Sequence, residues 1–229
     1  MNILELDNLT YSWPKQQLSI DIQHFSLLQG QKLFIKGPSG SGKSTLLNLL
    51  TGIIVANPGS SIKLLGQQLC ELSGADRDKF RADHIGYIFQ QFNLIPYLSV
   101  IENVLLPCRF SDTRADKVAT APRQQARKLL RKLKLSDSDI ATPVSALSIG
   151  QQQRVAVARA LIGSPELIIA DEPSSALDHD NRSAFIELLM QECQSSGATL
   201  IFVSHDPSLE PLFDRSVLLQ DINRQGIRP

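Results

Sequence analysis

Two stretches of this sequence combine glycine, serine and basic residues in a way that suits phosphate binding. The first is GPSGSGKST, residues 37–45, and the second is SALSIGQQQRVAVARAL, residues 145–161. In the second stretch, Ser148 and Gly150 come just before an apolar-periodic run, which predicts the N-terminus of a helix. Helix N-termini hold anions through their free N–H groups and the helix dipole. One chain therefore carries two candidate phosphate grips that lie far apart in the sequence.

The first stretch fits the pattern G-x-x-x-x-G-K-[ST] in full from Gly37 to Ser44. Its glycines let backbone N–H groups curl around a β-phosphate, and Lys43 places a positive charge against the β- and γ-phosphates. A flexible Gly/Ser loop is the alternative, but a strand is expected before the loop and a helix after it. We therefore predict a nucleotide site with Mg²⁺ that is formed by Gly37, Pro38, Ser39, Gly40, Ser41, Gly42, Lys43, Ser44 and Thr45.

Besides its own hydroxyl, a phosphate loop of this kind needs an acidic residue for Mg²⁺ at the end of a nearby strand. The run LIIADEP supplies it, because Asp171 follows a buried apolar stretch. Glu172 comes next, on the opposite side of the strand end, where a carboxylate can orient or deprotonate an attacking water. His205, in FVSHD, follows another predicted strand. A lone histidine is more often structural, but ligands bind at the carboxyl ends of parallel strands, so we expect His205 to contact the γ-phosphate.

These residues need strands and helices that bring them together. The segments 3–13 and 18–28 alternate apolar and polar residues and predict an antiparallel pair of strands. The run KLFIKG, 32–37, predicts a buried strand that leads into the phosphate loop, and the helix after it is expected to stop near Gly52. The remaining elements expected outside the middle of the chain are strands at 60–66, 84–90, 166–173 and 198–206, a helix at 182–197 and a closing hairpin at 215–227.

The middle of the chain, from 91 to 164, predicts a mainly helical lobe, with helices at 99–107, 123–135 and 150–163. Strands that alternate with helices predict an α/β fold with a largely parallel sheet and an N-terminal antiparallel β subdomain. We therefore expect a single domain over 1–229. Within it, 1–90 and 165–229 form the nucleotide-binding core and 91–164 an inserted helical subdomain.

The composition is that of a soluble globular protein, with 42% hydrophobic and 20% charged residues and a net charge of zero. Neutrality gives no bulk attraction to nucleic acid, and the basic run 123–134 is expected to be the solvated face of a helix. The N-terminus has no signal-peptide pattern, and no apolar run is long enough to span a bilayer. We therefore expect that a function at a membrane would require another protein to anchor the chain there. The three cysteines lack the spacing of a zinc site or a disulfide framework.

Together these residues resemble the ATPase subunits of ABC transporters over nearly the whole chain. LSIGQ, 147–151, is similar to the family signature LSGGQ, and SALD, 175–178, is similar to the D-loop. Gln90 is similar to the Q-loop glutamine and His205 to the switch histidine. Tyr11 stands where the family has an aromatic residue that stacks on adenine, and an ordinary strand aromatic is the equally weighted alternative.

The resemblance implies an ATP-hydrolysing subunit that dimerises around two ATP molecules. In the family, each ATP is held by the P-loop of one copy and the signature of the other, which accounts for the two phosphate grips. The residues expected to be catalytic are Glu172, His205 and Gln90, and those expected to hold Mg²⁺ are Ser44, Gln90 and Asp171. The nucleotide contacts expected from the signature and the D-loop are Ser148, Gly150, Gln151 and Asp178.

The finer resemblance, carried by residues 81–107 and 148–178, is to exporters of lipoproteins, macrolides or peptides and to their cell-division relative. It implies a membrane partner with a large periplasmic domain and a place at the cytoplasmic face of the inner membrane. The stretch from Phe92 to Tyr97 is apolar enough to receive that partner, and a buried connector is the alternative. A cell-division or importer complex is the other possibility in the family. DNA-repair ATPases rank lower because the chain has no heptad run for a long coiled coil, and translation ATPases rank lower because it has one cassette instead of two. P-loop kinases rank lower because they lack the signature.

One residue departs from the family pattern, because Ile149 stands where the signature has glycine. A β-branched residue does not readily take φ > 0, so we expect an ordinary backbone conformation there. Ile149 also crowds the approach of the partner's phosphate, and we therefore expect a working but slower site.

Overall fold

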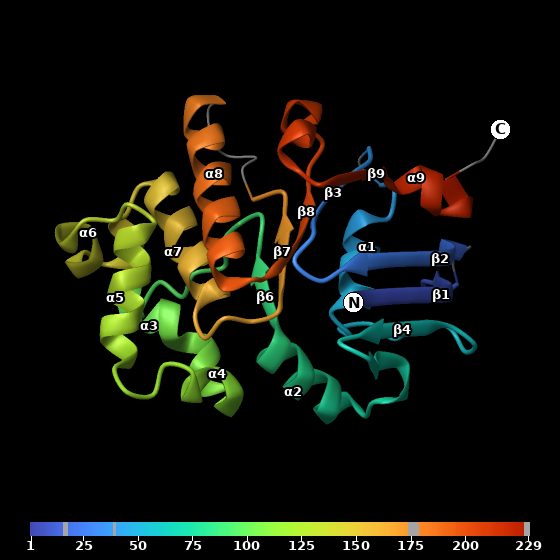
Figure 1. Ribbon diagram of the computed structural model, residues 1–229, viewed down its shortest axis with the longest axis horizontal. Helices are drawn as coiled ribbons and strands as arrows, with labels where there is room; N and C mark the ends of the chain where they lie inside the picture. Colours follow the sequence, from blue (N-terminus) through green and yellow to red (C-terminus); the bar gives the residue numbers. More distant parts are fainter. Residues whose placement is uncertain (16–17, 39, 174–178, 227–229) are drawn as a thin grey trace. The chain divides into compact units, whose positions relative to one another are not determined.

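The structure is a computed structural model that describes residues 1–15, 18–38, 40–173 and 179–226. The chain forms two compact units, whose elements are labelled in Figure 1. The first unit contains Met1–Arg81 and Thr199–Pro229, and the second contains Ala82–Ala198. Both units combine strands with helices, as expected of an α/β fold.

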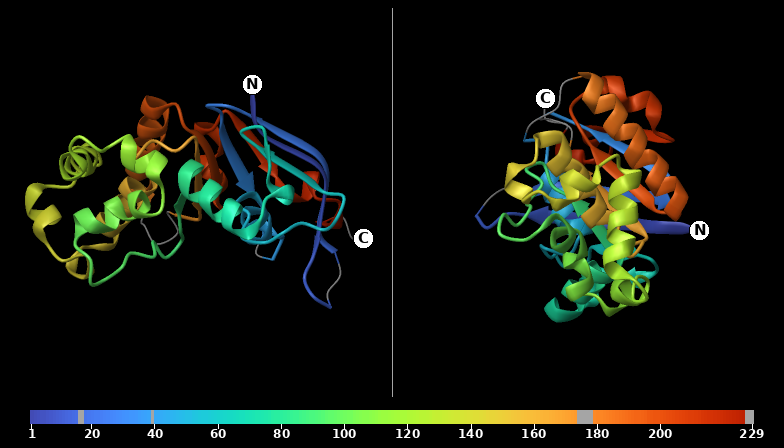
Figure 2. Two further views of the ribbon diagram at one scale, coloured as in Figure 1. Left: turned by 90° about the horizontal axis from the view of Figure 1, so that it is seen from below. Right: turned by 90° about the vertical axis from the view of Figure 1, so that its left-hand side faces the viewer.

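The first unit contains a four-stranded antiparallel sheet with the order β2-β1-β4-β5. Its strands are β1 (Asn2–Ser12), β2 (Leu18–Leu28), β4 (Ser61–Leu64) and β5 (Gln67–Gln68). The long strands β1 and β2, in blue, run side by side in Figure 2. Leu6 pairs with Phe25 and Leu9 with Ile22, and all four side chains are buried. The alternation of apolar residues therefore turns one face to the core and confirms the predicted antiparallel pair.

Three parallel strands of the first unit lead to the phosphate loop. They are β8 (Thr199–Val203), β3 (Lys32–Lys36) and β9 (Arg215–Leu218), with β3 in the middle. Phe34, Phe202 and Phe213 pack against one another, with ring centroids 5.1 to 6.2 Å apart. This aromatic cluster fixes β3 and β8 in one register and so fixes the starting point of the loop.

Helix α1 (Lys43–Leu50) begins where the phosphate loop ends. Its last turn closes at Thr51, and Gly52 follows with φ of 68°, in the left-handed region. A glycine in that conformation ends a helix without strain. The predicted strand at 32–37, the helix from Lys43 and the stop at Gly52 are all confirmed.

The predicted hairpin at 215–227 is wrong. After β9 the backbone enters α9 (Leu219–Ile222) and then a short 3-10 helix, Arg224–Gly226. The buried side chain of Asn223 accepts a 2.8 Å hydrogen bond from the amide of Asp21 and donates one of 3.1 Å to the carbonyl of Ser19. β9 pairs in parallel with β3, and Asn223 then fixes the helical turn against β2. These tertiary contacts override the alternating pattern of the sequence.

The second unit combines two parallel strands with most of the helices (Figure 1). The strands are β6 (Ile85–Ile88) and β7 (Leu167–Asp171), paired with Ile88 opposite Ala170. The helices are α3 (Val100–Leu105), α4 (Asp112–Asp116), α5 (Pro122–Lys132), α6 (Asp137–Ala141), α7 (Ile149–Leu161) and α8 (His179–Ser196). Residues 91–164 contain helices and loops without a strand. Their extent as a separate subdomain stays a prediction.

The remaining elements were not expected from the sequence. They are α2 (Gly74–His84), which reaches the boundary between the units, and the 3-10 helices Leu69–Glu71, Leu106–Arg109, Val144–Ala146 and Pro207–Leu212. Within the described ranges, every helix is too short or too polar to cross a membrane.

The C-terminal end of α7 is held firmly against β6. Gly86, on β6, lies so close to it that a Cβ atom there would sit 2.2 Å from the carbonyl oxygen of Ala160. Arg114 is 2% exposed and donates to the carbonyls of Ala160 and Ile162 at 2.8 Å and 2.6 Å, among others. Burial lowers the pKa of Arg114 to about 10, so the guanidinium still carries its charge at the carbonyl end of the helix. These contacts fix α7 as a rigid part of the second unit.

Candidate functional site

The phosphate loop, residues 37–45, joins β3 to α1. Gly40 and Gly42 have φ of 80° and 97°, which favours glycine. Gly42 is the N-cap of α1 and makes no side-chain cap, so the first-turn N–H groups are available to a ligand. No described atom lies within 4 Å of a Cβ position at Gly40, which leaves room for an anion. Ser39, also predicted to bind nucleotide, lies outside the described residues.

Two side chains of the loop show that it fits a phosphate group. Lys43 is buried, and its Nζ donates to the carbonyls of Gly37 at 2.7 Å and Pro38 at 3.0 Å. The hydroxyl of Ser41 is buried and has no hydrogen-bond partner among the described residues. A buried hydroxyl without a partner is unfavourable, and a phosphate oxygen would satisfy it. Ser44, in the first turn of α1, is exposed and can offer its hydroxyl to a metal ion.

His205 lies at the same sheet edge as the phosphate loop. β3 and β8 are parallel, with Ile35 opposite Val203, and the amide of Ser204 continues the ladder with a 3.2 Å bond to the carbonyl of Ile35. The strands therefore end together, and the loop after Lys36 and the exposed His205 follow the same edge. This is the edge at which ligands bind in parallel sheets.

The aromatic residues at the end of β1 differ in exposure. Tyr11 is only 9% exposed, whereas Trp13 is 36% exposed. Their rings meet edge to face, with centroids 5.2 Å apart. Both interpretations of Tyr11, as the adenine contact and as an ordinary strand aromatic, stay predictions. Trp13, one residue beyond β1, is the more exposed of the two rings and is a candidate that the sequence motifs did not indicate.

Two predicted site residues of the second unit lie at the ends of its two strands. Asp171 ends β7, and Gln90 follows β6, the parallel neighbour of β7, so both lie at the same edge. The hydroxyl of Tyr87 donates a 3.3 Å hydrogen bond to Oδ2 of Asp171. Burial and the charge of Asp171 raise the pKa of Tyr87, so the phenol stays protonated and acts as the donor. Tyr87 was not recognised in the sequence, where it is one of several apolar strand residues.

Glu172 occupies a strained turn directly after β7. Its φ is 45°, a conformation that non-glycine residues rarely adopt and that often marks functional sites. The next residue, Pro173, accepts a 2.7 Å hydrogen bond through its carbonyl from the buried side chain of Gln153, on α7. The turn that carries Glu172 is therefore attached to the helix that begins at the signature.

The signature, residues 147–151, forms the N-terminus of α7. The Ser148 hydroxyl accepts from the amide of Gln151 at 3.3 Å, and the Gln151 side chain accepts from the amide of Ser148 at 2.8 Å. This capping box leaves the hydrogen of the Ser148 hydroxyl without an acceptor among the described residues. A Cβ atom at Gly150 would meet nothing within 4 Å of the described part of the chain. The second candidate phosphate site is thus a capped helix end with open space at Gly150.

Ile149 is the first helical residue of α7 and is 54% exposed. It is not among the described residues with positive φ, which confirms the expected ordinary backbone conformation. Its side chain can therefore lie beside an approaching phosphate.

The structure brings the predicted site residues together in two groups. The phosphate loop and His205 share one edge in the first unit, while Gln90, Asp171 and Glu172 share one edge in the second. Asp178, predicted to contact nucleotide, lies outside the described residues together with the rest of the D-loop.

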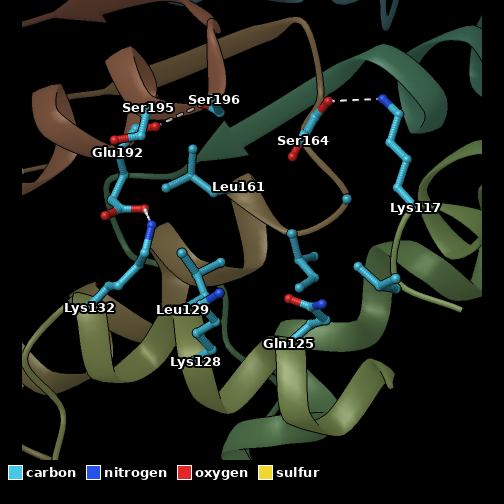
Figure 3. Close-up of a pocket in the computed structure, with 13 residues that line it drawn as sticks. Lys117, Gln125, Lys128, Leu129, Lys132, Leu161, Ser164, Glu192, Ser195 and Ser196 are labelled. Atoms are coloured by element: carbon cyan, nitrogen blue, oxygen red, sulfur yellow. Dashed lines mark hydrogen bonds and ion pairs between the residues drawn. The ribbon is translucent and has the colours of Figure 1, made fainter. Parts of the chain in front are cut away.

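A cavity of about 260 Å³ in the second unit lies between α5 and the ends of α7 and α8 (Figure 3). Lys132 pairs with Glu192 at 3.2 Å, and Lys117 donates to the carbonyl of Ser164 at 3.0 Å. Two of its lysines thus already neutralise an acid and the carbonyl end of a helix. None of the described site residues lines the cavity, so it is not the nucleotide site.

Comparisons with known proteins agree with these motifs. The sequence profile of the family described as "ABC transporter" matches residues 20–175. An uncharacterised ABC transporter ATP-binding protein of Mycobacterium tuberculosis is 38% identical over 221 residues, which are 95% of this chain and 87% of that protein. The macrolide export ATP-binding/permease protein MacB of Photorhabdus laumondii is 36% identical over 222 residues, which are 96% of this chain but 33% of MacB.

The fold has solved counterparts among ATP-binding cassettes. The ATP-binding cassette MJ0796 of Methanocaldococcus jannaschii, in a dimeric post-hydrolysis structure bound to ADP and Pi, superposes with a TM-score of 0.81. The two chains are 32% identical in that comparison, which covers 95% of this chain and 94% of the other. The chain therefore belongs to the ABC transporter family, as an ATP-binding subunit that hydrolyses ATP.

Proposed function

We propose that this ATPase drives an exporter of lipoprotein, peptide or small hydrophobic cargo through a separate integral membrane subunit with a periplasmic domain. The macrolide exporter MacB and a syringafactin export protein of Pseudomonas syringae, both named ATP-binding/permease proteins, are 36% identical to this chain. In each of them the match covers 33% of the length, so the cassette is one part of a longer export machine. The partner would hold this chain at the cytoplasmic face of the inner membrane.

The phosphate loop is the observation that carries the nucleotide part of the proposal. The unpartnered Ser41 hydroxyl, the left-handed Gly40 and Gly42 and the open first turn of α1 all suit the phosphates of ATP. Lys43 would turn its ammonium from the loop carbonyls toward the β- and γ-phosphates. When bound, Mg²⁺ neutralises phosphate charge, and the residues that would hold it are Ser44, Gln90 and Asp171.

Glu172 and His205 would act on hydrolysis. Glu172 would orient and deprotonate the attacking water, because it is the carboxylate next to the metal-holding Asp171 on the strained turn after β7. His205 would contact the γ-phosphate from the sheet edge that it shares with the phosphate loop. Gln90, after the neighbouring strand β6, would complete the set around the metal and the water.

The signature would hold the nucleotide of a second copy of the chain. Ser148 retains a hydroxyl hydrogen to donate, Gly150 leaves the helix end open, and Gln151 stabilises the cap. The dimeric structure of MJ0796 with ADP and Pi supports such a pair. ATP would then join two copies because only the triphosphate reaches both surfaces, and hydrolysis would release them.

The test of this function is Glu172→Gln, which keeps the shape of the side chain and removes the base. We expect the variant to bind ATP, to lose turnover and to accumulate as an ATP-dependent dimer in size-exclusion chromatography. Lys43→Ala is the matched control and should lose both ATP binding and the dimer. A Glu172→Gln chain that stays monomeric with saturating ATP and its membrane partner would contradict the proposed role of Glu172.

The exporter assignment needs its own measurement. Affinity purification of the chain from its native membranes, followed by mass spectrometry, should recover an integral membrane protein with few spanning helices and a large periplasmic domain. Recovery of an importer permease or of a cell-division membrane protein would contradict the exporter and leave the ATPase assignment intact.

A further inference from the structure

The segment 89–99, which follows Gln90 and leads to α3, contains an unusual bend. Phe92 and Asn93 have φ of 59° and 48°, so two successive non-glycine residues are left-handed. Asparagine tolerates this region, but phenylalanine rarely enters it, and the conformation persists only where surrounding contacts impose it. The Phe92 side chain is buried and that of Tyr97 is 85% exposed, so the docking role expected of the stretch from Phe92 to Tyr97 stays a prediction. The bend therefore needs a structural reason within the second unit.

The reason is a buried arginine on α7. Arg159 is 7% exposed, and its guanidinium donates to the carbonyl of Phe92 at 2.5 Å and to the carbonyl of Asn93 at 2.6 Å. Both left-handed residues thus present their carbonyls to one guanidinium. Burial lowers the pKa of Arg159 because it desolvates the charged guanidinium, and the two carbonyl dipoles offset part of that cost. Arginine suits this place because its planar fork can reach two acceptors at once.

The far end of the segment is held in a similar way. Asn103, on α3, is fully buried, and its side-chain amide donates to the carbonyls of Ile95 and Ser99, both at 3.1 Å. Its oxygen accepts from the amide of Ile95 at 2.8 Å. The backbone of the segment is therefore fixed at two points, and the first of them lies two residues after Gln90.

We propose that Arg159 is a positioning residue, which clamps the Phe92–Asn93 bend to α7 and thereby holds Gln90 at the strand edge. The role rests on the proposed function, because the place of Gln90 matters only if Gln90 serves the nucleotide site. α7 is a firm support for the clamp, since Arg114 and the close approach at Gly86 fix its C-terminal end. The same helix begins at Ser148, so the clamp also joins Gln90 to the signature through one rigid element.

The first test is Arg159→Lys in the full chain, because lysine keeps the charge but offers one nitrogen where the guanidinium offers a separate nitrogen to each carbonyl. We expect amide hydrogen exchange in segment 89–99 to rise about tenfold, with exchange in α1 unchanged. We expect kcat for ATP to fall about tenfold, since small misplacements of positioned groups are costly, with KM changed by less than about twofold. Arg154→Lys is the matched control on the same helix. Arg154 makes a 3.2 Å bond to the carbonyl of Lys134, which is outside segment 89–99, and should keep the original values.

The second test changes the bend and leaves Arg159 intact. Proline cannot adopt the φ of 48° at Asn93, whereas glycine can, and the Asn93 side chain is exposed. Asn93→Pro should therefore reproduce the loss of kcat and the faster exchange, while Asn93→Gly should stay within about threefold of the original kcat. The two Asn93 variants therefore test the clamp even if Arg159→Lys does not fold.

Two results would overturn the proposal, and they distinguish a failure of the clamp from a failure of the proposed function. Unchanged exchange in segment 89–99 and unchanged kcat, in Arg159→Lys or in Asn93→Pro, would show that there is no clamp. Full turnover in Gln90→Ala, together with loosened exchange in Arg159→Lys, would instead show that the clamp exists but that Gln90 has no role at the nucleotide.

Discussion

The hydroxyl of Tyr87 donates a hydrogen bond of 3.3 Å to the carboxylate of Asp171, across the paired ends of β6 and β7. This contact joins a strand residue to the acid that we propose as a magnesium ligand. The phenol keeps its proton, because burial and the charge of Asp171 both raise its pKa. Asp171 is thus oriented before any metal binds.

Tyr87→Phe should weaken magnesium binding. The change removes the hydrogen bond that orients Asp171 and keeps the ring, which stacks on Phe89 with centroids 4.4 Å apart. Loss of such outer contacts typically lowers metal affinity by about tenfold or more. Titration of ATPase activity with Mg²⁺ should show a higher half-saturating concentration. Tyr97→Phe, at an 85% exposed ring, is the control, and equal titration curves for the two variants would contradict the prediction.

Trp13 should report and support nucleotide binding. It is the single tryptophan of the chain and is more exposed than Tyr11, so we propose that it provides the ring face for adenine. Stacking of a base on an aromatic side chain contributes about 1–3 kcal/mol, so Trp13→Ala should raise the Kd for ATP about tenfold. ATP should also change the tryptophan fluorescence of the unaltered chain. Tyr11→Phe should leave the affinity for ATP unchanged. If it lowers that affinity more than Trp13→Ala does, Tyr11 is the adenine contact and the prediction for Trp13 is wrong.

Ile149→Gly should raise the rate of ATP hydrolysis. The Ile149 side chain is 54% exposed at the first position of α7, beside the helix end that we propose to receive the phosphate of a second copy. Removing it frees the approach, at a cost of about 1 kcal/mol in helix propensity. Steady-state kcat is the quantity to measure, at protein concentrations that allow pairing. An unchanged kcat would show that Ile149 does not slow turnover.

The hydrogen bond between His84 and Glu166 should make the second unit sensitive to acid. Burial raises the pKa of Glu166, but the 2.9 Å hydrogen bond from His84 and the charge of Lys117 outweigh it, and the net pKa is lowered. A lowered folded-state pKa means that ionised Glu166 stabilises the fold above its ordinary pKa of 4.5, and that this contribution disappears as the pH falls through the folded-state pKa.

Glu166→Gln should therefore lower the free energy of unfolding at pH 7 by less than about 1 kcal/mol, the range of partly exposed ion pairs. Urea unfolding at several pH values should show the difference between the two proteins shrinking below pH 4.5. A difference that stays constant down to pH 3 would contradict this interpretation.

The sequence was most informative where local chemistry decides the structure. The alternation in β1 and β2 and the glycine pattern of the phosphate loop each require one backbone arrangement, and both were predicted. Helix α2 was not predicted, because the stretch GADRDKFRADH has few apolar residues and no clear apolar face. The turn after β9 also escaped prediction, since it depends on the contact of Asn223 with distant β2.

The sequence indicates the residue types of the candidate site but not the contacts that support them. Motif spacing indicated the phosphate loop, Asp171 and Glu172. The left-handed turn at Glu172 and the bend at Phe92 arise from contacts with α7, which no local pattern reveals. The relative exposure of Tyr11 and Trp13 depends likewise on which face of β1 the core covers.

The hydrogen bond from Gln153 to Pro173 would couple the hydrolysis events in the two nucleotide pockets of the proposed dimer. In such a pair, α7 would meet the neighbour's ATP at its first residues and steady the turn of its own Glu172 a short way along. Loss of a terminal phosphate from one pocket would then disturb the acid that serves the opposite pocket. Two such subunits, each with its own rigid α7, would hydrolyse ATP in concert or in alternation, and their turnover would rise more steeply than linearly with ATP.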